Sequence, residues 1–520
     1  MANTNRPTTS THQQLIVPPN GDAVLGRSSN KFRYYNNFPL VEKQIGQDPK
    51  YYVKRRPPVE NTGIVMSSVP GLNGVGSVYY EPVFKTMWFT NQRTVVMTNN
   101  TSTTPTEDVD RIIAPTAGTG FPETSIEAYL VGDTHYICVM ATTTGNFTRI
   151  YFYSPAGTFL EEVAISAASF RGKLVFLDGY LFAAGANQRI YNSTIGNPKE
   201  WLIGANFLDA EMDRDPLLTL AKHHNHIVGF GSDTIEFFYN NANEIGSPLQ
   251  RQVAYASREV GLFSHLAVGT GFGADTQPDN SLVEIGEVIY FIGSNDGICQ
   301  GLYKIENFKV TKVSDHSLDL RLRETIYPKL STFDLNGESC VLLMDQLAVK
   351  FPVVFIPSLQ ISVEFQWDFV PTHSISYNPR GLSNVTVLFK TGGDSTSFLY
   401  SSGYFQLINP TPQVETFTSQ YTVDYIDFNN NANKHFKYVD VLGSFESNQV
   451  AIGYRKDNFG YDNGEFINLP YISASAAGPE GNLRFRNLGY ARRQGYTVFV
   501  NGPDDYLYKG VAIGYNQWGE

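Results

Sequence analysis

The chain has 520 residues and is rich in aromatic residues and glycine, with 31 Tyr, 35 Phe and 45 Gly. This length is enough for two or three domains, and the composition favours strands and turns over helices. The formal net charge of −11 argues against a general nucleic-acid-binding surface, which needs clustered Lys and Arg. Three scattered cysteines, Cys138, Cys299 and Cys340, form neither a disulfide framework nor a zinc pattern, so we expect them to be small buried side chains.

The beginning of the chain predicts little regular structure. Residues 1–29 are rich in Thr, Asn, Gln and Pro and lack the apolar core of a secretory signal, so we expect a flexible N-terminal arm. Residues 30–74 combine Pro, Tyr and basic residues without clear periodicity, which predicts an extended strap. No stretch approaches the ~18 consecutive apolar residues of a membrane span.

Seven imperfect copies of one strand–turn–strand pattern follow. One copy, HIVGFGSDTIEFFYN, places β-type residues on both sides of a turn rich in Gly, Ser, Asp and Thr. A degenerate repeat of about 50 residues with a hairpin at its centre is typical of a β-propeller. The landmarks in the first strand of each copy are Trp88, Tyr136, Tyr180, Ile227, Ile289, Val341 and Thr386, separated by 48, 44, 47, 62, 52 and 45 residues.

The repeats predict a mainly β protein with a six- to seven-bladed propeller over residues 75–410. The count of blades stays open, because the last copy forms either a seventh blade or the completion of the first. Packing small sheets around a ring buries the faces that a single sheet would expose. A pair of β-sandwiches with similar hairpins is the alternative architecture.

One segment, SDHSLDLRLRETIYPKL, departs from the strand pattern. Leu318, Leu322 and Ile326 fall at positions i, i+4 and i+8, which predicts an amphipathic helix of about three turns near residues 315–330. The leucine and isoleucine stripe either packs on the rim of the propeller or docks a neighbouring subunit, and the sequence leaves both open.

After the repeats, residues 411–520 contain further short strands separated by polar loops, such as YTVDYIDF, QVAIGYR and YLYKGVAIGY. This pattern predicts a separate C-terminal antiparallel β-sandwich. Four arginines gather within it, interleaved with aromatic residues, on an otherwise acidic chain. They suggest either a contact surface for a partner or for passing DNA, or a solvated strand face. These candidate contacts are Arg484, Arg486, Arg492 and Arg493.

Candidate catalytic and metal-binding groups are weak. His224 and His226 would share one face of a strand, next to His223, but no third ligand at a fixed spacing accompanies them, so a surface cluster at a blade edge is expected. Two groups of carboxylates could form the paired acids of a glycosidase, but they read more simply as solvated loops. These groups are Glu107, Asp108 and Asp110, and Glu211, Asp213 and Asp215. We predict no catalytic residue, metal or cofactor.

The order of these parts resembles the tail hub, or nozzle, proteins of short-tailed bacteriophages, the packaged-DNA-stabilisation family. The resemblance depends on YYNNFPL with YYVKRRP in the strap, HIVGFGSDTIEFFY and VGLFSHLAVGTGF in the repeats, and FRNLGYARRQGY near the end. Arg492 and Arg493, with Gly489 and Tyr496, match the family pattern by position, whereas Arg484 departs from it.

The resemblance implies a non-enzymatic virion protein of the tail, assembled in the host cytoplasm. It implies a homohexameric ring beneath the portal and the head-to-tail adaptor ring, with a distal tail needle, fibre or tailspike as further partners. Double-stranded DNA would pass through the lumen without sequence recognition, both while the genome is retained and during ejection.

Two other functions stay open. A propeller glycosidase or depolymerase acting on host surface glycan would lose activity on changing Asp213 or Asp215. A monomeric scaffold or glycan-binding propeller would present one face to its ligand, but it leaves the strap, the helix and the C-terminal sandwich unexplained.

Overall fold

The computed structural model describes residues 9–16, 32–42, 50–66, 75–91, 95–99, 106–108, 123–143, 147–210, 215–243, 246–257, 259–263, 281–324, 328–345, 352–367, 371–377, 385–391, 397–401, 417–426, 434–457, 466–468, 472–473, 483–491, 493–502 and 506–517. The chain divides into two compact units. The first lies within residues 1–58, 353–367 and 413–520, and the second within residues 59–352 and 368–412.

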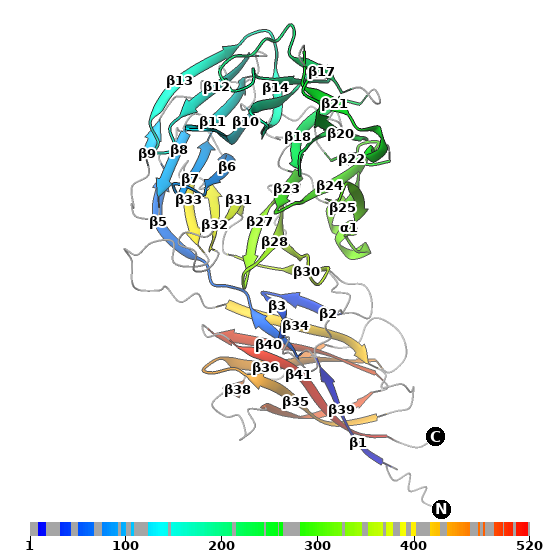
Figure 1. Ribbon diagram of the computed structural model, residues 1–520. Coiled ribbons are helices and arrows are strands. Elements are labelled where there is room, and N and C mark those ends of the chain that lie inside the picture. The colour runs from blue at the N-terminus through cyan, green and yellow to red at the C-terminus, as the bar shows by residue number, and fades with distance from the viewer. Residues whose placement is uncertain are drawn as a thin grey trace, which may run out of the picture. The chain divides into compact units, whose positions relative to one another are not determined.

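The second unit is a ring of small antiparallel sheets that follow one another in chain order (Figure 1). The first three sheets have four strands each. Their strands are β6 (Val75–Glu81), β7 (Thr86–Asn91), β8 (Val95–Asn99) and β9 (Thr106–Asp108); β10 (Glu123–Val131), β11 (Thr134–Thr143), β12 (Phe147–Tyr153) and β13 (Phe159–Ile165); and β14 (Phe170–Leu177), β15 (Tyr180–Gly185), β16 (Arg189–Asn192) and β17 (Phe207–Asp209).

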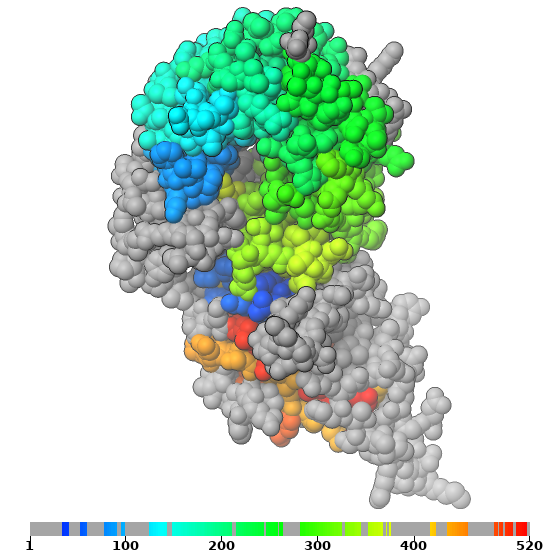
Figure 2. Space-filling view, viewed as in Figure 1, coloured from blue at the N-terminus to red at the C-terminus, as the bar shows by residue number. Residues whose placement is uncertain are grey.

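The remaining sheets of this unit continue around the ring, and the fourth and fifth appear in successive shades of green in Figure 2. The fourth has four strands, the fifth has five, the sixth is a hairpin within this unit, and the last recruits β5 from the N-terminal side. Their strands are β18 (Leu217–His223), β19 (His226–Gly231), β20 (Ile235–Asn240) and β21 (Leu249–Arg251); β22 (Gly261–Leu262), β23 (Leu282–Ile285), β24 (Val288–Asn295), β25 (Ile298–Glu306) and β26 (Lys309–Lys312); β27 (Pro328–Leu335) and β28 (Glu338–Asp345); and β31 (Pro371–Tyr377), β32 (Val385–Thr391), β33 (Ser397–Ser401) and β5 (Glu60–Met66). A 3₁₀ turn, η1 (Val253–Tyr255), follows β21.

Contacts between successive inner strands close this ring. Strands β6, β10, β14 and β18 contact one another in sequence, β18 contacts β24, β23 contacts β27, β27 contacts β31, and β31 contacts β6. The described residues thus form a seven-bladed propeller. The last repeat, with Thr386 on β32, builds a seventh blade with β5 instead of completing the first. All seven landmark residues lie in the second strand of their blades, and the alternative of paired sandwiches is wrong for these repeats.

The blades are held by apolar side chains that face a neighbouring sheet on each side. Leu218, Phe230 and Phe237 of the fourth blade pack in one cluster with Leu262 and Phe291 of the fifth. Because a blade has a neighbouring blade on each face, its strands need continuous apolar runs instead of an alternation of apolar and polar residues. The three cysteines are free and buried, as the sequence predicts.

The first unit is a β-sandwich of two antiparallel-rich sheets. Tyr421 on one sheet packs against Tyr508 on the other, with ring centroids 5.1 Å apart. The strands of the first sheet are β1 (Thr9–Ile16), β3 (Asn37–Glu42), β4 (Lys50–Arg55), β35 (Lys434–Ser444), β39 (Leu483–Ala491) and β41 (Leu507–Gln517). Those of the second are β2 (Phe32–Tyr35), β29 (Val353–Ile356), β30 (Ile361–Glu364), β34 (Phe417–Ile426), β36 (Gln449–Asp457), β37 (Phe466–Asn468), β38 (Ile472–Ser473) and β40 (Arg493–Gly502).

The structure places three segments differently from the sequence-based boundaries. Within the predicted flexible arm, Thr9–Ile16 pairs with β41 as strand β1. Within the predicted strap, residues 32–42 and 50–55 form sandwich strands, and 60–66 joins the propeller. Residues 353–367, which fall within the predicted propeller span, belong to the sandwich unit. Strand pairing satisfies the backbone N–H and C=O groups that an extended strap would leave exposed.

Arg56 shows why the strap segment is ordered. Its guanidinium lies over the Phe417 ring at 3.8 Å and donates hydrogen bonds to the Gln366 carbonyl at 2.8 Å and to Asn36 Oδ1 at 3.2 Å. A buried guanidinium is costly unless acceptors bind its N–H groups, and an aromatic ring face adds a favourable cation–π contact. Arg56, a basic residue of the predicted extended strap, therefore stabilises the sandwich.

Candidate functional site

A cavity of about 450 Å³ lies on the axis of the propeller. All seven blades line it through their inner strands, β6, β10, β14, β18, β23, β27 and β31. Its volume is within the range of small-molecule pockets. Four charged side chains contributed by four consecutive blades line it, and none of them was predicted from the sequence.

The charged wall of the cavity consists of Glu127 on β10, Lys173 on β14, Lys222 on β18 and Glu284 on β23. Lys173 Nζ lies 3.6 Å from Glu284 Oε1, which is an ion pair rather than a short hydrogen bond. About a third of each of these two side chains is exposed, 29% for the lysine and 37% for the glutamate, so their pair is partly solvated.

Glu127 has the most perturbed carboxyl group of the site. Its pKa is raised to about 8, mainly by burial and also by the nearby Glu284 carboxylate, while Lys173 and Lys222 act in the opposite direction. Removal of a carboxylate from water disfavours its ionised form, and here that effect exceeds the attraction of two ammonium groups. The side chain is therefore largely protonated at neutral pH and donates one hydrogen.

The other wall of the cavity carries hydroxyl groups and apolar side chains from β6, β27 and β31. Burial, with Glu127 close by, raises the pKa of the Tyr79 phenol, so this group stays protonated. Ser331 and Ser374 are hydrogen-bonded to each other's strands, the Ser374 amide donating to Ser331 Oγ at 3.1 Å. This wall presents neutral donors and acceptors.

Small polar side chains fix the inner strands that carry the charges. The Leu174 amide donates to Ser125 Oγ at 2.9 Å, which joins β14 to β10. The Lys173 amide donates to Thr219 Oγ1 at 3.0 Å, which joins β14 to β18. Because β14 is tied on both sides, the backbone of Lys173 has one position in the cavity wall. The arrangement suits binding of a small charged molecule.

The sequence carried only a faint signal for this site. Its charges lie within or at the end of β-type runs, as in TSIEAYL for Glu127 and SLVEI for Glu284. Each run comes directly before the strand that carries a repeat landmark, and each forms the inner strand of its blade. Only the closure of the ring shows that four such residues face one another.

The structure divides those of the predicted arginines that it describes between the two sheets. Arg484 and Arg486 lie on β39 of the first sheet, Arg493 begins β40 of the second, and Arg492 lies outside the described residues, as does the side chain of Arg493. Arg484 donates two hydrogen bonds of 2.6 Å to Asp440 and lies over the Tyr438 ring at 4.1 Å. Arg484 is therefore paired with a local acid, which agrees with the alternative of a solvated strand face. Arg486 is exposed.

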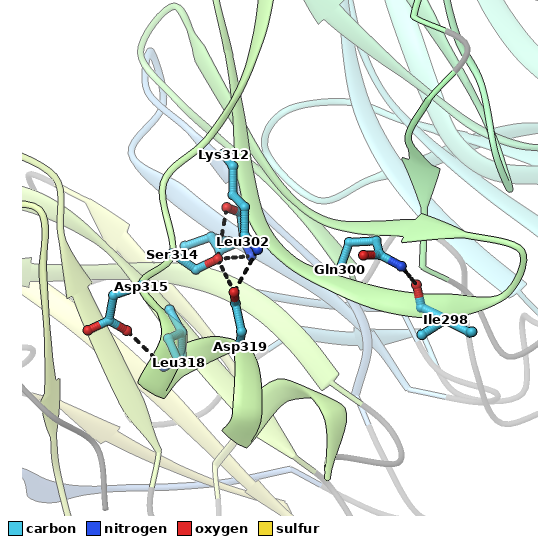
Figure 3. A network of polar contacts seen from close by, with 8 residues as sticks. All are labelled: Ile298, Gln300, Leu302, Lys312, Ser314, Asp315, Leu318 and Asp319. Atoms are coloured by element: carbon cyan, nitrogen blue, oxygen red, sulfur yellow. Dashed lines mark hydrogen bonds and ion pairs between the residues drawn. The ribbon is translucent and has the colours of Figure 1, made fainter. Parts of the chain in front are cut away.

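The predicted helix forms, but it is shorter than expected. Helix α1 (His316–Arg323) is capped by Asp315, whose Oδ1 accepts a hydrogen bond from the Leu318 amide at 2.8 Å (Figure 3). Residues 328–335 are strand β27, since a helix rarely continues past the residue before a proline such as Pro328. Ile326 lies outside the described residues.

The apolar stripe of α1 is used inside the subunit. Leu318 and Leu322 are buried, and the helix packs on β25 of the fifth blade. These two leucines do not form an exposed docking surface, so the rim-packing alternative describes them. Asp319 fastens the helix to the blade through Lys312 Nζ at 2.6 Å and Ser314 Oγ at 2.5 Å (Figure 3).

The histidine cluster lies where the fourth and fifth blades meet. His223 is buried, and its Nε2 accepts a hydrogen bond of 3.2 Å from the Phe308 amide. Burial and the neighbouring His224 lower the pKa of His223 and also that of His226. No group of three metal-ligating side chains occurs among the described residues, and the predicted surface cluster is correct for His224 and His226 but not for His223.

The one candidate acid that the structure describes in full has a structural role. Asp215 Oδ2 accepts hydrogen bonds from the amides of Asp233 and Thr234 at 2.9 and 3.0 Å, and its Oδ1 accepts one from the Thr234 hydroxyl at 3.0 Å. A carboxylate engaged in this way shapes the β19–β20 turn. Asp110, Glu211 and Asp213, and the side chains of Glu107 and Asp108, lie outside the described residues.

Comparison with known proteins identifies the propeller. Residues 134–339 match the family model Phage_stabilise, described as Bacteriophage P22 Gp10, beta-propeller. The match covers less than half of the chain and supports a resemblance of this segment to the phage family. The resemblance to the packaged-DNA-stabilisation family that the sequence suggested is thereby confirmed. No curated protein matches the chain.

The propeller is also similar to several solved structures. They include a chain of a mitotic checkpoint complex, with 11% identity, a TM-score of 0.39 and coverage of 66% of this chain and 94% of that chain. The WD40 beta propeller domain of Doa1 has 10% identity, a TM-score of 0.38 and coverage of 66% and 97%. U3-55K has 8% identity, a TM-score of 0.39 and coverage of 66% and 99%. No helix in the described part of the chain is long and apolar enough to cross a membrane.

Proposed function

We propose that this chain is a structural protein of the virion tail of a short-tailed bacteriophage, a hub or nozzle that acts as a homohexameric ring. The ring lies beneath the portal and the head-to-tail adaptor, extends the DNA channel, retains the packaged genome and conducts it during ejection. The observation that carries the proposal is the family match over residues 134–339 of a closed seven-bladed propeller.

The charge of the chain supports a conduit more than a DNA-binding role. Each copy has a formal net charge of −11, and six copies multiply it. Binding of duplex DNA gains free energy when Lys and Arg release counterions from phosphates. An acidic lumen offers few such contacts, so DNA slides through it without sequence recognition.

The geometry of the propeller limits where the DNA passes. The axial cavity holds about 450 Å³, the volume of a small-ligand pocket, and its wall is closed by side chains of seven inner strands. A duplex therefore does not pass along the axis of a single propeller. In the proposed ring, the lumen lies between subunits, and each propeller is a rigid segment of its wall.

The proposed partners are the adaptor ring on one side and a distal needle, fibre or tailspike on the other. The subunit is assembled in the host cytoplasm and incorporated into the tail, and it has no enzymatic role. Asp215, the described candidate acid of a glycosidase, is engaged in the β19–β20 turn, which supports the structural alternative.

Electron microscopy of the full chain tests this function. The purified protein is mixed with the portal–adaptor complex of the phage that encodes it, and two-dimensional averages are computed. We expect six-fold rings attached below the adaptor, and particles of the tail that react with an antibody to this chain. Absence of the chain from purified virions, or hydrolysis of host glycan by the purified protein, would contradict the proposal.

A further inference from the structure

The charges of the axial cavity do not neutralise one another in pairs. Lys173 faces Glu284 at 3.6 Å. Lys222 and Glu127 complete the group, and no ion pair of 4.0 Å or less joins either of them to another side chain described in the cavity wall. The ammonium group of Lys222 is exposed in the cavity, so it has room for a ligand.

The donors of this wall exceed its acceptors. Lys173 and Lys222 provide ammonium donors, and Glu127 provides a hydroxyl donor because burial and Glu284 raise its pKa to about 8. The Glu284 carboxylate already has Lys173 as its partner in the wall. The wall is therefore matched by a ligand that brings negative charge and acceptor oxygens.

We propose that the axial cavity of the propeller binds a small oxyanion, a phosphate or a carboxylate, between Lys222, Lys173 and the carboxyl group of Glu127. The opposite wall is neutral, and its Ser331 and Ser374 hydroxyls donate to the Ser374 and Thr332 carbonyls. The site is independent of the proposed function, since it depends only on the fold of one subunit.

The same geometry disfavours a cation. Two ammonium groups face the space in which a metal ion would lie, and none of the described residues forms a group of three metal-ligating side chains there. A strand of duplex DNA is too large for about 450 Å³. A small molecule with several oxygen acceptors satisfies the volume, the charge and the donor count together.

Titration calorimetry of the full chain with inorganic phosphate at pH 7 tests the site, with potassium chloride at equal ionic strength as the reference and acetate as a second arm. We expect saturable binding of one ion per chain, and the stronger of the two arms distinguishes phosphate from carboxylate. Lys222→Met is expected to weaken binding by about tenfold, as loss of a charged hydrogen bond does. Lys309→Met, an exposed lysine on the outer strand β26, is the matched control and is expected to bind as the wild type.

A pH series separates this site from unspecific anion binding. Sulfate is used, because its charge is constant between pH 6 and 9. The titratable groups that line the cavity are Tyr79 and Tyr80 on β6, Glu127, Lys173, Lys222 and Glu284, while β27 and β31 contribute only neutral residues. Ionisation of Glu127 as the pH rises past about 8 adds a negative charge and removes a donor, so wild-type binding weakens. Glu127→Gln is expected to retain binding at pH 9.

Two results would overturn the proposal. One is the absence of saturable binding in both arms at pH 7. The other is an affinity that is unchanged in Lys222→Met, or a pH dependence of binding that is the same in Glu127→Gln as in the wild type. The ions would then bind elsewhere. Either result leaves the hexameric ring and its imaging test unaffected.

Discussion

Glu127 couples the axial cavity to the stability of the propeller. Its pKa is about 8 in the folded chain and 4.5 as an ordinary glutamate, so folding favours the protonated group. The contribution to stability is fully present below pH 4.5 and is lost as the pH rises through 8. Between these values the folded state binds more protons than the unfolded state, so the free energy of unfolding falls with rising pH.

Glu127→Gln is expected to remove this part of the pH dependence. A neutral amide of the same shape has no proton to lose, so chemical denaturation of the variant should show a smaller decrease in stability between pH 5 and pH 8.5. Glu200→Gln, at an exposed position between β16 and β17, is the matched control and should keep the wild-type slope. Equal slopes for the wild type and Glu127→Gln would show that the cavity does not perturb this carboxyl group.

The stability that is linked to His223 changes with pH in the opposite direction, and it is lost at acidic pH. Burial lowers its pKa, so the fold favours the neutral imidazole, and the associated stability is present above about pH 6.5 and lost on acidification. The neutral ring accepts the Phe308 amide at the β25–β26 turn, where Asn307 and Phe308 both have positive φ. A protonated ring cannot accept this bond.

Acidification is therefore expected to open the β25–β26 turn first. Hydrogen exchange measured by mass spectrometry from pH 7.5 to pH 5 should show, after correction for intrinsic rates, loss of protection at Phe308 before loss in the strands of the first three blades. His223→Ala should show low protection at Phe308 at every pH, whereas His316→Gln, on the exposed start of α1, should behave as the wild type. Uniform loss of protection across the propeller would contradict this role.

At the level of elements, β25 and α1 fit together because one position of the strand has no side chain. Gly301 has φ of +127°, and a Cβ there would lie 2.3 Å from Asp319 Oδ1 and 2.4 Å from Ser314 Oγ. These are the atoms of the network that fastens the helix to the blade (Figure 3). Both the backbone conformation and the lack of space therefore require glycine.

Gly301→Ala is expected to destabilise the chain by about 2–4 kcal/mol, because it adds a steric clash to an unfavourable φ. Gly286→Ala separates the two effects, since that residue has φ of +60° but no atom within 4 Å of the added Cβ, and about 1 kcal/mol is expected. Thermal unfolding of both variants gives the comparison. Equal losses of stability in the two variants would mean that α1 moves away from the added methyl group of Gly301→Ala with no loss of stability.

Strand pairing explains which elements could be predicted. The hairpins between Trp88 and Thr386 are local in sequence, so a turn and two β-type runs predict each of them, and the repeat shows the propeller. The pairing of Phe32–Tyr35 with residues 420–423 joins segments almost 400 residues apart, and no local pattern encodes it. The sequence therefore showed a strap where the structure has sandwich strands.

The axial site could not be predicted for the same reason at larger scale. Glu127, Lys173, Lys222 and Glu284 lie on four blades, and each is an unremarkable charge until the ring closes. The arginines of FRNLGYARRQGY, by contrast, are adjacent in sequence but divided between two sheets, because the chain passes from β39 to β40 within them. Arginines that are close in sequence therefore lie on different sheets, whereas charges that are one blade apart in sequence line the same cavity.

In the whole molecule, one strand keeps the propeller closed. Strand β5 precedes the first blade in the chain but pairs with β33 of the last, so the two ends of the ring are joined by β5 on the outside and by the β31–β6 contact on the inside. Strands added from the opposite end of the chain secure a ring that would otherwise depend on side-chain packing between its first and last blades.

Val65→Pro tests this closure, with Val163→Pro as the matched control. Val65 on β5 pairs with Phe398 on β33. Val163, on the outer strand β13 of an internal blade, pairs with Ile150 on β12. Each proline fixes φ and removes the backbone N–H of an outer strand, which disfavours its pairing. We expect Val163→Pro to lower hydrogen-exchange protection only in β12 and β13. Val65→Pro should also expose the inner strands β31 and β6, because release of β5 lets the last blade separate from the first. If protection at β6 is unchanged in Val65→Pro, packing of the inner strands alone is sufficient to hold the ring.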